Sequence, residues 1–355
     1  MKIIHCADIH LGSKLASKFP KNISAERKRE VLDTFSRMVD YAKKNDVKVI
    51  MLSGDVFDKD KPAKKDKTFF YSAIKNNPDI DFLYLNGNHD KEGSYTDNNI
   101  PNLKTFGKDD FTSYAYGDIV ITGIEMNEDN ARAYYSKLML DGTKTNILML
   151  HGDVSDSVGM DKVKISELRD KGIDYLALGH IHSYKTGKID DRGVWAFSGC
   201  LEGRGFDECG KKGFVLVDAA DKLSFSFVPF AKRTIQEINV DISSAADLYE
   251  TQQLVRNEVD TISRDDILNI ILKGDVPIDA IIDEKDIENS LSDFYFAHVK
   301  NKTSVKINAS DYVNDRSLIG EFIRSVLANG DYNDSEKKDI ITVGLRLLSG
   351  KGVDR

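Results

Sequence analysis

The chain has 355 residues, of which 41% are hydrophobic and 30% charged, and its formal net charge is −8. This length fits one large domain plus a smaller one, and the composition excludes a disordered chain. No apolar run approaches the roughly 20 residues that a membrane-spanning helix needs, and the acidic charge argues against a broad nucleic-acid-binding surface.

The first residues, MKIIHCADIHLGS, predict a first strand rather than a signal peptide. The three cysteines, Cys6, Cys200 and Cys209, are odd in number and lack the spacing of a metal site. We therefore expect free thiols in a reducing compartment, and a cytoplasmic protein.

Short apolar strands alternate with amphipathic helices over the first 230 residues. The helix between the first two strands carries Val31, Phe35 and Met38 at helical spacing, with Ser24 as its expected N-cap. Such alternation predicts a mainly parallel sheet with helices packed on it. The later strands come closer together and end in apparent hairpins, which predicts a second, more antiparallel sheet. The expected strands cover 2–6, 47–52, 82–85, 119–123, 147–150, 175–178, 194–197, 214–217 and 223–227.

The pattern changes near Pro229, so we expect one domain over residues 1–231 and a smaller α/β domain over 232–355. Residues 231–355 hold 16 lysines and arginines against 23 acidic residues, which leaves a net charge of only −1 for the first 230. This region predicts strands at 235–242, 268–272 and about 294–299, a helix after 247, and two closing helices at 318–327 and 336–348.

Polar residues of one kind follow the N-terminal strands. The segments are ADIHLGS, SGDVFD, NGNHD, LHGDV and LGHIHS, and together they contain five of the seven histidines of the chain. Residues two apart in an extended segment point the same way, and ligands bind beyond the carboxyl ends of strands in an open α/β sheet. Imidazoles, carboxylates and an amide oxygen are ligands that Mn²⁺, Fe²⁺ and Zn²⁺ accept. Seven such side chains suit two ions that share a carboxylate: Asp8, His10, Asp55, Asn88, His151, His180 and His182.

This ordered set resembles the calcineurin-like metallophosphoesterase superfamily. The resemblance implies a four-layer α/β sandwich in which two β-sheets are flanked by helices. It also implies one ion held by Asp8, His10, Asp55 and His182, a second held by Asp55, Asn88, His151 and His180, and Asp55 as the bridge. His89 is then the acid that protonates the leaving oxygen, and Asp90 is expected to orient His89 or a ligand imidazole.

The segments ADIHLGSKL, GDVFDKDKP and SGCLEGRGFDECGKKGFVLVD are similar to the SbcD-type nuclease subunits of DNA double-strand-break repair. In that family a Glu followed by Lys-Gly opens a strand after the last metal motif, as Glu208, Lys212 and Gly213 do in this sequence. Asp58 stands where archaeal and eukaryotic relatives have a second histidine. The resemblance implies a Mn²⁺-dependent exonuclease, with endonuclease activity left open, a capping domain, and an SbcC-like coiled-coil ATPase as partner; a homodimer is a further expectation.

Basic residues near these motifs are candidate contacts for DNA phosphates, namely Lys59, Lys61, Lys64, Lys65 and Arg204. The final helices offer two apolar faces. The face with Leu318, Phe322 and Ile323 is expected to be core, and the face with Ile341, Leu345 and Leu348 is the expected docking face for the ATPase. A hydrolase of small or cyclic phosphoesters with the same two ions remains the alternative function.

Overall fold

The computed structural model describes residues 1–15, 19–58, 62–90, 100–127, 134–157, 159, 161–220, 222–277, 280–306 and 312–348. The chain forms two compact units, Met1–Thr234 and Ile235–Arg355. Lys232 and Arg233 belong to the first unit, because Lys232 Nζ and Arg233 Nε each lie 2.9 Å from Glu30 Oε1.

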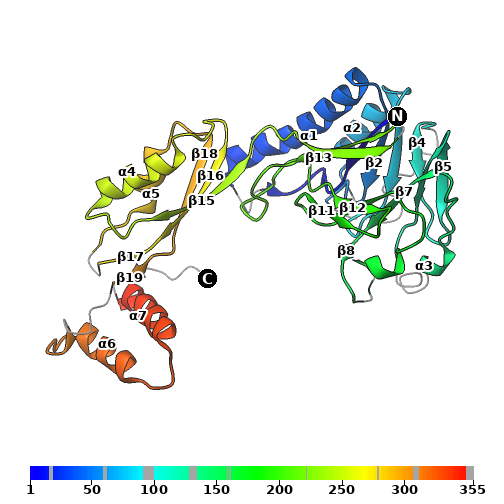
Figure 1. Ribbon diagram of the computed structural model, residues 1–355. Coiled ribbons are helices and arrows are strands. Elements are labelled where there is room, and N and C mark those ends of the chain that lie inside the picture. The colour runs from blue at the N-terminus through cyan, green and yellow to red at the C-terminus, as the bar shows by residue number, and fades with distance from the viewer. Residues whose placement is uncertain are drawn as a thin grey trace. The chain divides into compact units, whose positions relative to one another are not determined.

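Two six-stranded mixed sheets form the centre of the first unit, in the orders β14-β13-β1-β2-β3-β4 and β11-β12-β10-β7-β6-β5 (Figure 1). In each sheet three neighbouring pairs are parallel and two are antiparallel. The strands of the first sheet are β1 (Lys2–Cys6), β2 (Val47–Ser53), β3 (Asp81–Leu85), β4 (Leu103–Thr105), β13 (Gly213–Ala219) and β14 (Leu223–Pro229). Those of the second are β5 (Thr112–Tyr116), β6 (Ile119–Gly123), β7 (Thr145–His151), β10 (Tyr175–Gly179), β11 (Lys185–Lys188) and β12 (Val194–Phe197).

Alternation of buried side chains along the strands produces the layers. One face of the first sheet, with Ile50 and Leu52, packs on α1 (Lys21–Lys44) and α2 (Lys64–Lys75). The opposite face, with Val49 and Met51, packs on the second sheet. The outer face of the second sheet is covered by a cluster that includes α3 (Tyr134–Lys137). This is the expected sandwich of two sheets between helices. The short strands β8 (Asp153–Val154) and β9 (Lys162–Val163) pair with one another.

Two local predictions were wrong. The second sheet is no more antiparallel than the first, because the hairpin of β13 and β14 pairs with β1 at the edge of the first sheet. Ser24 is not the N-cap of α1, which begins three residues earlier after Pro20. The Ser24 hydroxyl instead donates to the carbonyl oxygens of Leu15 and Phe19, both at 3.0 Å.

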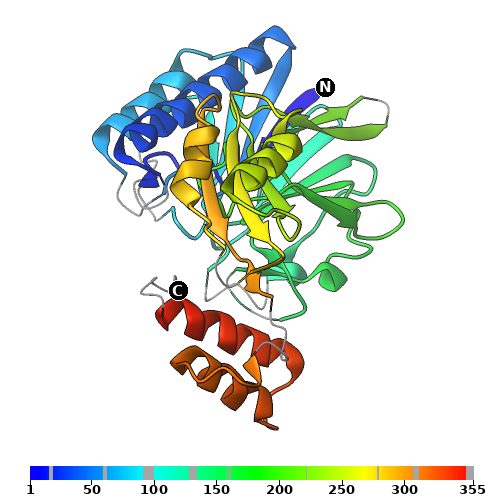
Figure 2. The same ribbon diagram turned by 90° about the vertical axis from the view of Figure 1, so that its left-hand side faces the viewer.

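The second unit has a parallel three-stranded sheet in the order β15-β16-β18, with α4 and α5 lying side by side next to it (Figure 2). Asp247 begins α4 as its N-cap, since its carboxylate accepts from Glu250 N–H at 2.8 Å. The elements are β15 (Ile235–Asp241), α4 (Leu248–Val259), β16 (Ile267–Lys273), β17 (Asp275–Val276), α5 (Glu284–Ser290), β18 (Phe296–Asn301), β19 (Ser304–Val305), α6 (Leu318–Ala328) and α7 (Asp334–Leu348).

The helices α6 and α7 pack on one another through Ile323, Ile341 and Leu345, each at most 6% exposed. The prediction that α6 contributes core is confirmed for Ile323, although Leu318 is 72% exposed. The assignment of Ile341 and Leu345 to a docking face was wrong, because both side chains are buried against α6.

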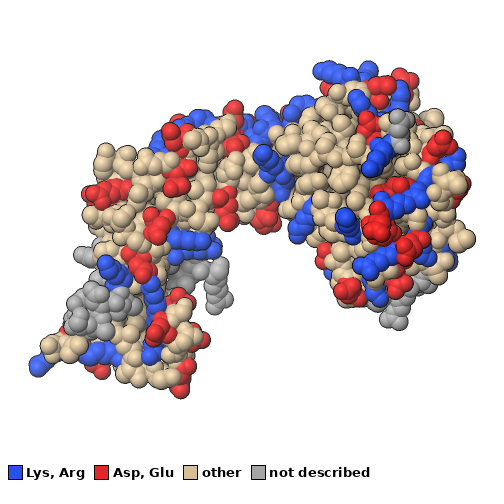
Figure 3. All heavy atoms as spheres, in the orientation of Figure 1, with Lys and Arg blue, Asp and Glu red and all other residues tan. Residues whose placement is uncertain are grey.

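No helix in the described part of the chain is long and apolar enough to cross a membrane. On the face of the first unit seen in Figure 3, basic and acidic side chains are interspersed. All three cysteines are free thiols, as expected.

Candidate metal centre

The predicted ligands come from the carboxyl ends of five strands. Asp8 and His10 follow β1, Asp55 follows β2, Asn88 follows β3, His151 ends β7, and His180 and His182 follow β10. The loops after β1 and β2 run side by side, since Asp8 N–H donates to Gly54 O and His10 N–H donates to Asp55 O, both at 3.0 Å. Strands from both sheets therefore deliver side chains to one place.

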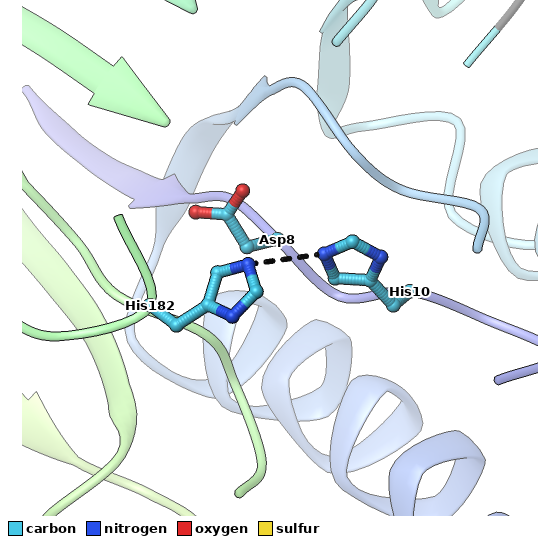
Figure 4. Close-up of side chains that lie close together, drawn as sticks. All are labelled: Asp8, His10 and His182. Carbon is cyan, nitrogen blue, oxygen red and sulfur yellow. Dashed lines mark hydrogen bonds between the residues drawn. The ribbon is translucent and has the colours of Figure 1, made fainter. Parts of the chain in front are cut away.

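The first cluster contains Asp8, His10 and His182, whose ligand atoms lie within 4.8 Å of one another. The two imidazoles point toward one another beside the Asp8 carboxylate, with their Nε2 atoms 3.3 Å apart (Figure 4). Asp8 and His10 are 0% and 1% exposed. Two nitrogens bound to one ion at about 2.1 Å and a tetrahedral angle lie roughly 3.4 Å apart, so this spacing suits a shared cation.

A carboxylate stands beside each Nδ1 atom, so that both Nε2 atoms remain for such an ion, although only His182 Nδ1 is hydrogen-bonded. Glu208 Oε1 lies 2.8 Å from His182 Nδ1, and Asp58 Oδ1 lies 3.4 Å from His10 Nδ1. Both carboxylates have a pKa below the ordinary value, Glu208 and Asp58 alike, because ion pairs and hydrogen bonds outweigh their burial. An ionised carboxylate only accepts, so Asp58 and Glu208 favour a proton on Nδ1 and leave the Nε2 atoms for an ion.

The second cluster contains Asp8, Asp55 and His151. His151 Nδ1 donates to the Ser53 carbonyl at 2.9 Å, and its Nε2 lies 3.0 Å from Asn88 Oδ1. Asn88 Oδ1 is also 3.2 Å from His180 Nδ1. Asp55, His151 and Asn88 are thus linked by direct contacts, whereas His180 contacts this set through Asn88 and does not belong to the cluster.

Asp55 lies between the two positions. Its Oδ2 is 3.5 Å from His151 Nε2 and 3.9 Å from His10 Nε2. Asp8 is the residue common to both clusters, and its two oxygens accept from the His180 N–H at 3.0 and 3.1 Å. Two carboxylates thus stand between the imidazole sets, where the sequence predicted one bridge.

Four of the ligands have left-handed backbone angles: φ is 52° at Asp8, 51° at His10, 53° at Asp55 and 106° at His180. Asp8 and His10 therefore converge through a tightly turned segment, not through the extended one that was predicted. Non-glycine residues rarely adopt such angles, and each costs on the order of 1 kcal/mol or more. Strain concentrated at ligand positions is typical of functional sites.

The pKa values of the centre favour positive charge beside Asp55. Burial raises the pKa of Asp8 to about 6. Burial also acts to raise the pKa of Asp55, but contact with His151 holds it well below its usual range. Burial acts to lower the pKa of His151, yet Asp55 outweighs it and raises the pKa to about 9. Asp55 therefore needs a proton on His151 or a metal ion beside it. The donor set fits two divalent metal ions.

The two predicted catalytic residues lie in different surroundings. His89 is exposed, its backbone N–H donates to Asp55 Oδ1 at 2.9 Å, and its ring centroid is 5.1 Å from that of His10. Asp90 is 4% exposed, and its carboxylate accepts from the backbone N–H groups of Val56 and Phe57 at 3.0 and 2.9 Å. Asp90 therefore holds the loop after β2, and its expected contact with an imidazole was wrong.

The residues predicted to contact DNA also differ in their surroundings. Lys59 and Lys61 lie outside the described residues, whereas Lys64 and Lys65 are exposed in the first turn of α2. Arg204 is only 8% exposed and pairs with Glu208 and Asp58, so its assignment to phosphate binding was wrong.

Sequence reasoning also missed how Glu208 and Lys212 act on His182. Lys212 Nζ donates to the His182 carbonyl at 2.7 Å, and Glu208 binds its ring. The position of Glu208 and Lys212 soon after the last metal motif was the available signal.

Curated relatives align over both units. "DNA double-strand break repair protein Mre11" of Sulfurisphaera tokodaii is 25% identical over 96% of this chain and 92% of its own. The protein of the same name from Saccharolobus solfataricus is 27% identical over 78% of this chain and 76% of its own. The "uncharacterized metallophosphoesterase YhaO" of Bacillus subtilis is 25% identical over 78% of this chain and 72% of its own.

The calcineurin-like phosphoesterase family pattern matches residues 1–184, which is more than half of the chain and contains all seven predicted ligands. The chain therefore belongs to the calcineurin-like phosphoesterase family and has the site of a metal-dependent phosphoester hydrolase.

Proposed function

We propose that this protein is a Mn²⁺-dependent DNA nuclease that acts in double-strand-break repair and cuts exonucleolytically, with endonuclease activity left open. The observation that carries the proposal is the reach of the similarity: it spans 96% of this chain, and thus the second unit as well as the phosphoesterase domain. Phosphoester hydrolysis alone would require only the first unit.

The chain's own residues divide the work at the scissile phosphodiester. Bound divalent ions would supply charge neutralisation for the phosphate and activation of a water nucleophile. His10 and His182 hold one position, His151 and Asn88 hold the other, and Asp55 lies between them. His89 projects from the same loop as Asn88 without belonging to either cluster. We assign it the transfer of a proton to the leaving oxygen, a step typically worth about 10²–10⁴-fold in rate.

Selection of DNA is assigned to the second unit and to exposed lysines. Lys64 and Lys65 stand at the start of α2, next to the metal loops: a Cβ at Gly12 would lie 2.7 Å from Asp66 Oδ2 of that helix. Residues 231–355 carry a net charge of −7, so the second unit, as a cap, would select DNA by shape rather than by phosphate affinity.

An ATPase of the SbcC type is the proposed partner. The apolar side chains that α7 leaves in solvent are Val343, Leu347 and Leu348, at 40%, 60% and 47% exposed. This face keeps Leu348 of the predicted one, whose Ile341 and Leu345 are buried. A homodimer and a cytoplasmic location remain predictions that go with this function.

Hydrolysis of a small or cyclic phosphoester is the second candidate. The interspersed charges on the visible face of the first unit, and the acidic second unit, favour it (Figure 3). A two-metal site by itself does not distinguish a nucleic acid from a small phosphodiester.

The test compares purified protein on linear duplex DNA, single-stranded DNA and an aryl phosphodiester, with Mn²⁺ and in turn Fe²⁺, Mg²⁺ and Zn²⁺. We expect Mn²⁺-dependent cleavage of duplex DNA, abolished by a chelator and by His89→Ala. Turnover of the aryl ester without any DNA cleavage, with or without an ATPase partner, would overturn the proposal in favour of the second candidate.

A further inference from the structure

The Arg204 guanidinium lies between two carboxylates from separate parts of the chain. Asp58 lies after β2, and Arg204 Nη1 donates to its Oδ1 at 3.3 Å. Glu208 lies between β12 and β13. Arg204 Nε donates to the two oxygens of Glu208 at 3.1 and 3.2 Å, and Arg204 Nη2 donates to Glu208 Oε1 at 2.5 Å. Only 10% of the Arg204 side chain is exposed.

Each of these carboxylates faces an imidazole of the first metal cluster. Asp58 Oδ1 is 3.4 Å from His10 Nδ1, which is a charge contact and not a hydrogen bond, and Glu208 Oε1 is hydrogen-bonded to His182 Nδ1 at 2.8 Å. Arg204 Nη2 also lies 3.1 Å from His182 Nδ1. One guanidinium therefore stands behind both histidines, on the side away from the facing Nε2 atoms.

The shape of an arginine fits this place and that of a lysine does not. A guanidinium is a planar fork with five fixed donors, which binds two acceptors in defined directions, whereas an ammonium is a point charge. Without the cation, Asp58 and Glu208 would be two like charges beside the same pair of imidazoles. Their repulsion would turn at least one of them away from the Nδ1 atom that it holds.

We propose that Arg204 is a positioning residue of the first metal site: by holding Asp58 and Glu208 it fixes the tautomer and direction of His10 and His182. The inference rests on the two-metal function proposed above, and not on DNA as the substrate. It gives Asp58 a place beside the metal ligands.

Calorimetric titration of the full chain with Mn²⁺, without any substrate, tests the proposal. In Arg204→Met we expect the first ion to bind about 10–100-fold more weakly, the usual effect of losing a partner of a metal ligand, and the second ion to change less. The control is Arg192→Met. Arg192 makes a similar pair with Asp174, at 2.9 and 2.8 Å, ahead of β10 and thus at the end of that strand opposite to the ligands. Both ions should bind this control as they bind the natural chain.

A spectroscopic measurement separates positioning from general destabilisation. Nitrogen NMR of the metal-free protein should show His10 and His182 as the Nδ1–H tautomer in the natural chain and as a mixture in Arg204→Met. Arg204→Lys restores the charge but not the planar fork of donors, so we expect its affinity for the first ion to lie between those of the natural chain and Arg204→Met. If Arg204→Met does not fold, Asp58→Asn removes the His10 half of the bridge alone and must still weaken the first ion.

Three results would overturn the inference: an unchanged or tighter first ion in Arg204→Met, natural affinity in Arg204→Lys, or fewer than two ions bound by the natural chain. A natural chain that binds both ions but does not cut DNA would refute the nuclease function and leave the role of Arg204 intact.

Discussion

A single methyl group at Gly87 is predicted to disable the metal centre. A Cβ at this position would lie 2.1 Å from Asp55 Oδ1 and 2.5 Å from the Asp55 backbone nitrogen. Ordinary contact begins at 3.4 Å, so the carboxylate would have to move by about 1.3 Å. The glycine is therefore required by the close approach of Asp55 and not by a turn.

The size of the effect follows from that displacement. Overpacking of this kind typically costs about 1–3 kcal/mol of stability, and a shift of about 1 Å in an active site costs on the order of 10²-fold in rate. Because Asp55 also accepts from the His89 N–H, Gly87→Ala should displace the acid together with the bridge. We expect both ions to bind more weakly and the rate of hydrolysis to fall by at least about 10²-fold.

The assay is Mn²⁺ titration followed by hydrolysis of an aryl phosphodiester at saturating Mn²⁺. The matched control is Gly330→Ala, because a Cβ at Gly330 would meet nothing within 4 Å. Full metal affinity and full activity in Gly87→Ala would show that the loop yields without cost and that the reasoning from close approach is wrong.

Four further predictions follow from the site and the fold. His89→Ala should abolish cleavage while both ions stay bound, and loss of a full equivalent of metal in this variant would refute the role given to His89. Asp55→Ala should weaken both ions and His10→Ala chiefly one; equal loss of one ion from each would contradict the bridge. Residues 1–234 alone should hydrolyse aryl phosphodiesters but cut duplex DNA poorly, and undiminished duplex cleavage would remove the case for a DNA-selecting cap. Burial lowers the pKa of His5 to about 3 in the folded protein, whereas its ordinary value is 6.5. On acidification the His5 imidazole is therefore protonated first in the unfolded chain, and the free energy of unfolding should fall as the pH drops from about 6.5 toward 3. Guanidinium titrations between pH 7 and 5 should show a shallower loss for His5→Phe than for the natural chain.

The order of elements and the ligand set could be predicted because they depend on local patterns. Apolar runs mark the strands, and the polar residues at their ends are the ones that the structure brings together. Contacts between distant segments left no such mark. Nothing near residues 213–229 indicates that their hairpin joins β1 rather than the second sheet.

The misassigned charged residues have the same cause. Arg204 was taken for a phosphate contact because an arginine in a glycine-rich loop is usually exposed, and its two partners lie 146 and 4 residues away. Asp90 follows His89 directly, yet its carboxylate turns to the backbone 33 and 34 residues earlier. On α7, Ile341 and Leu345 form an apolar stripe whether they face a partner or α6, and only the fold decides between these.

The left-handed backbone at Asp8 and Asp55 has an evolutionary consequence. Glycine or asparagine at these positions would relieve both the backbone strain and a buried charge, each at some gain in stability. A duplicated gene released from selection for catalysis should therefore lose these two aspartates early while keeping its fold. Descendants of this chain with glycine or asparagine at positions 8 and 55 should be inactive and more heat-stable than their parent.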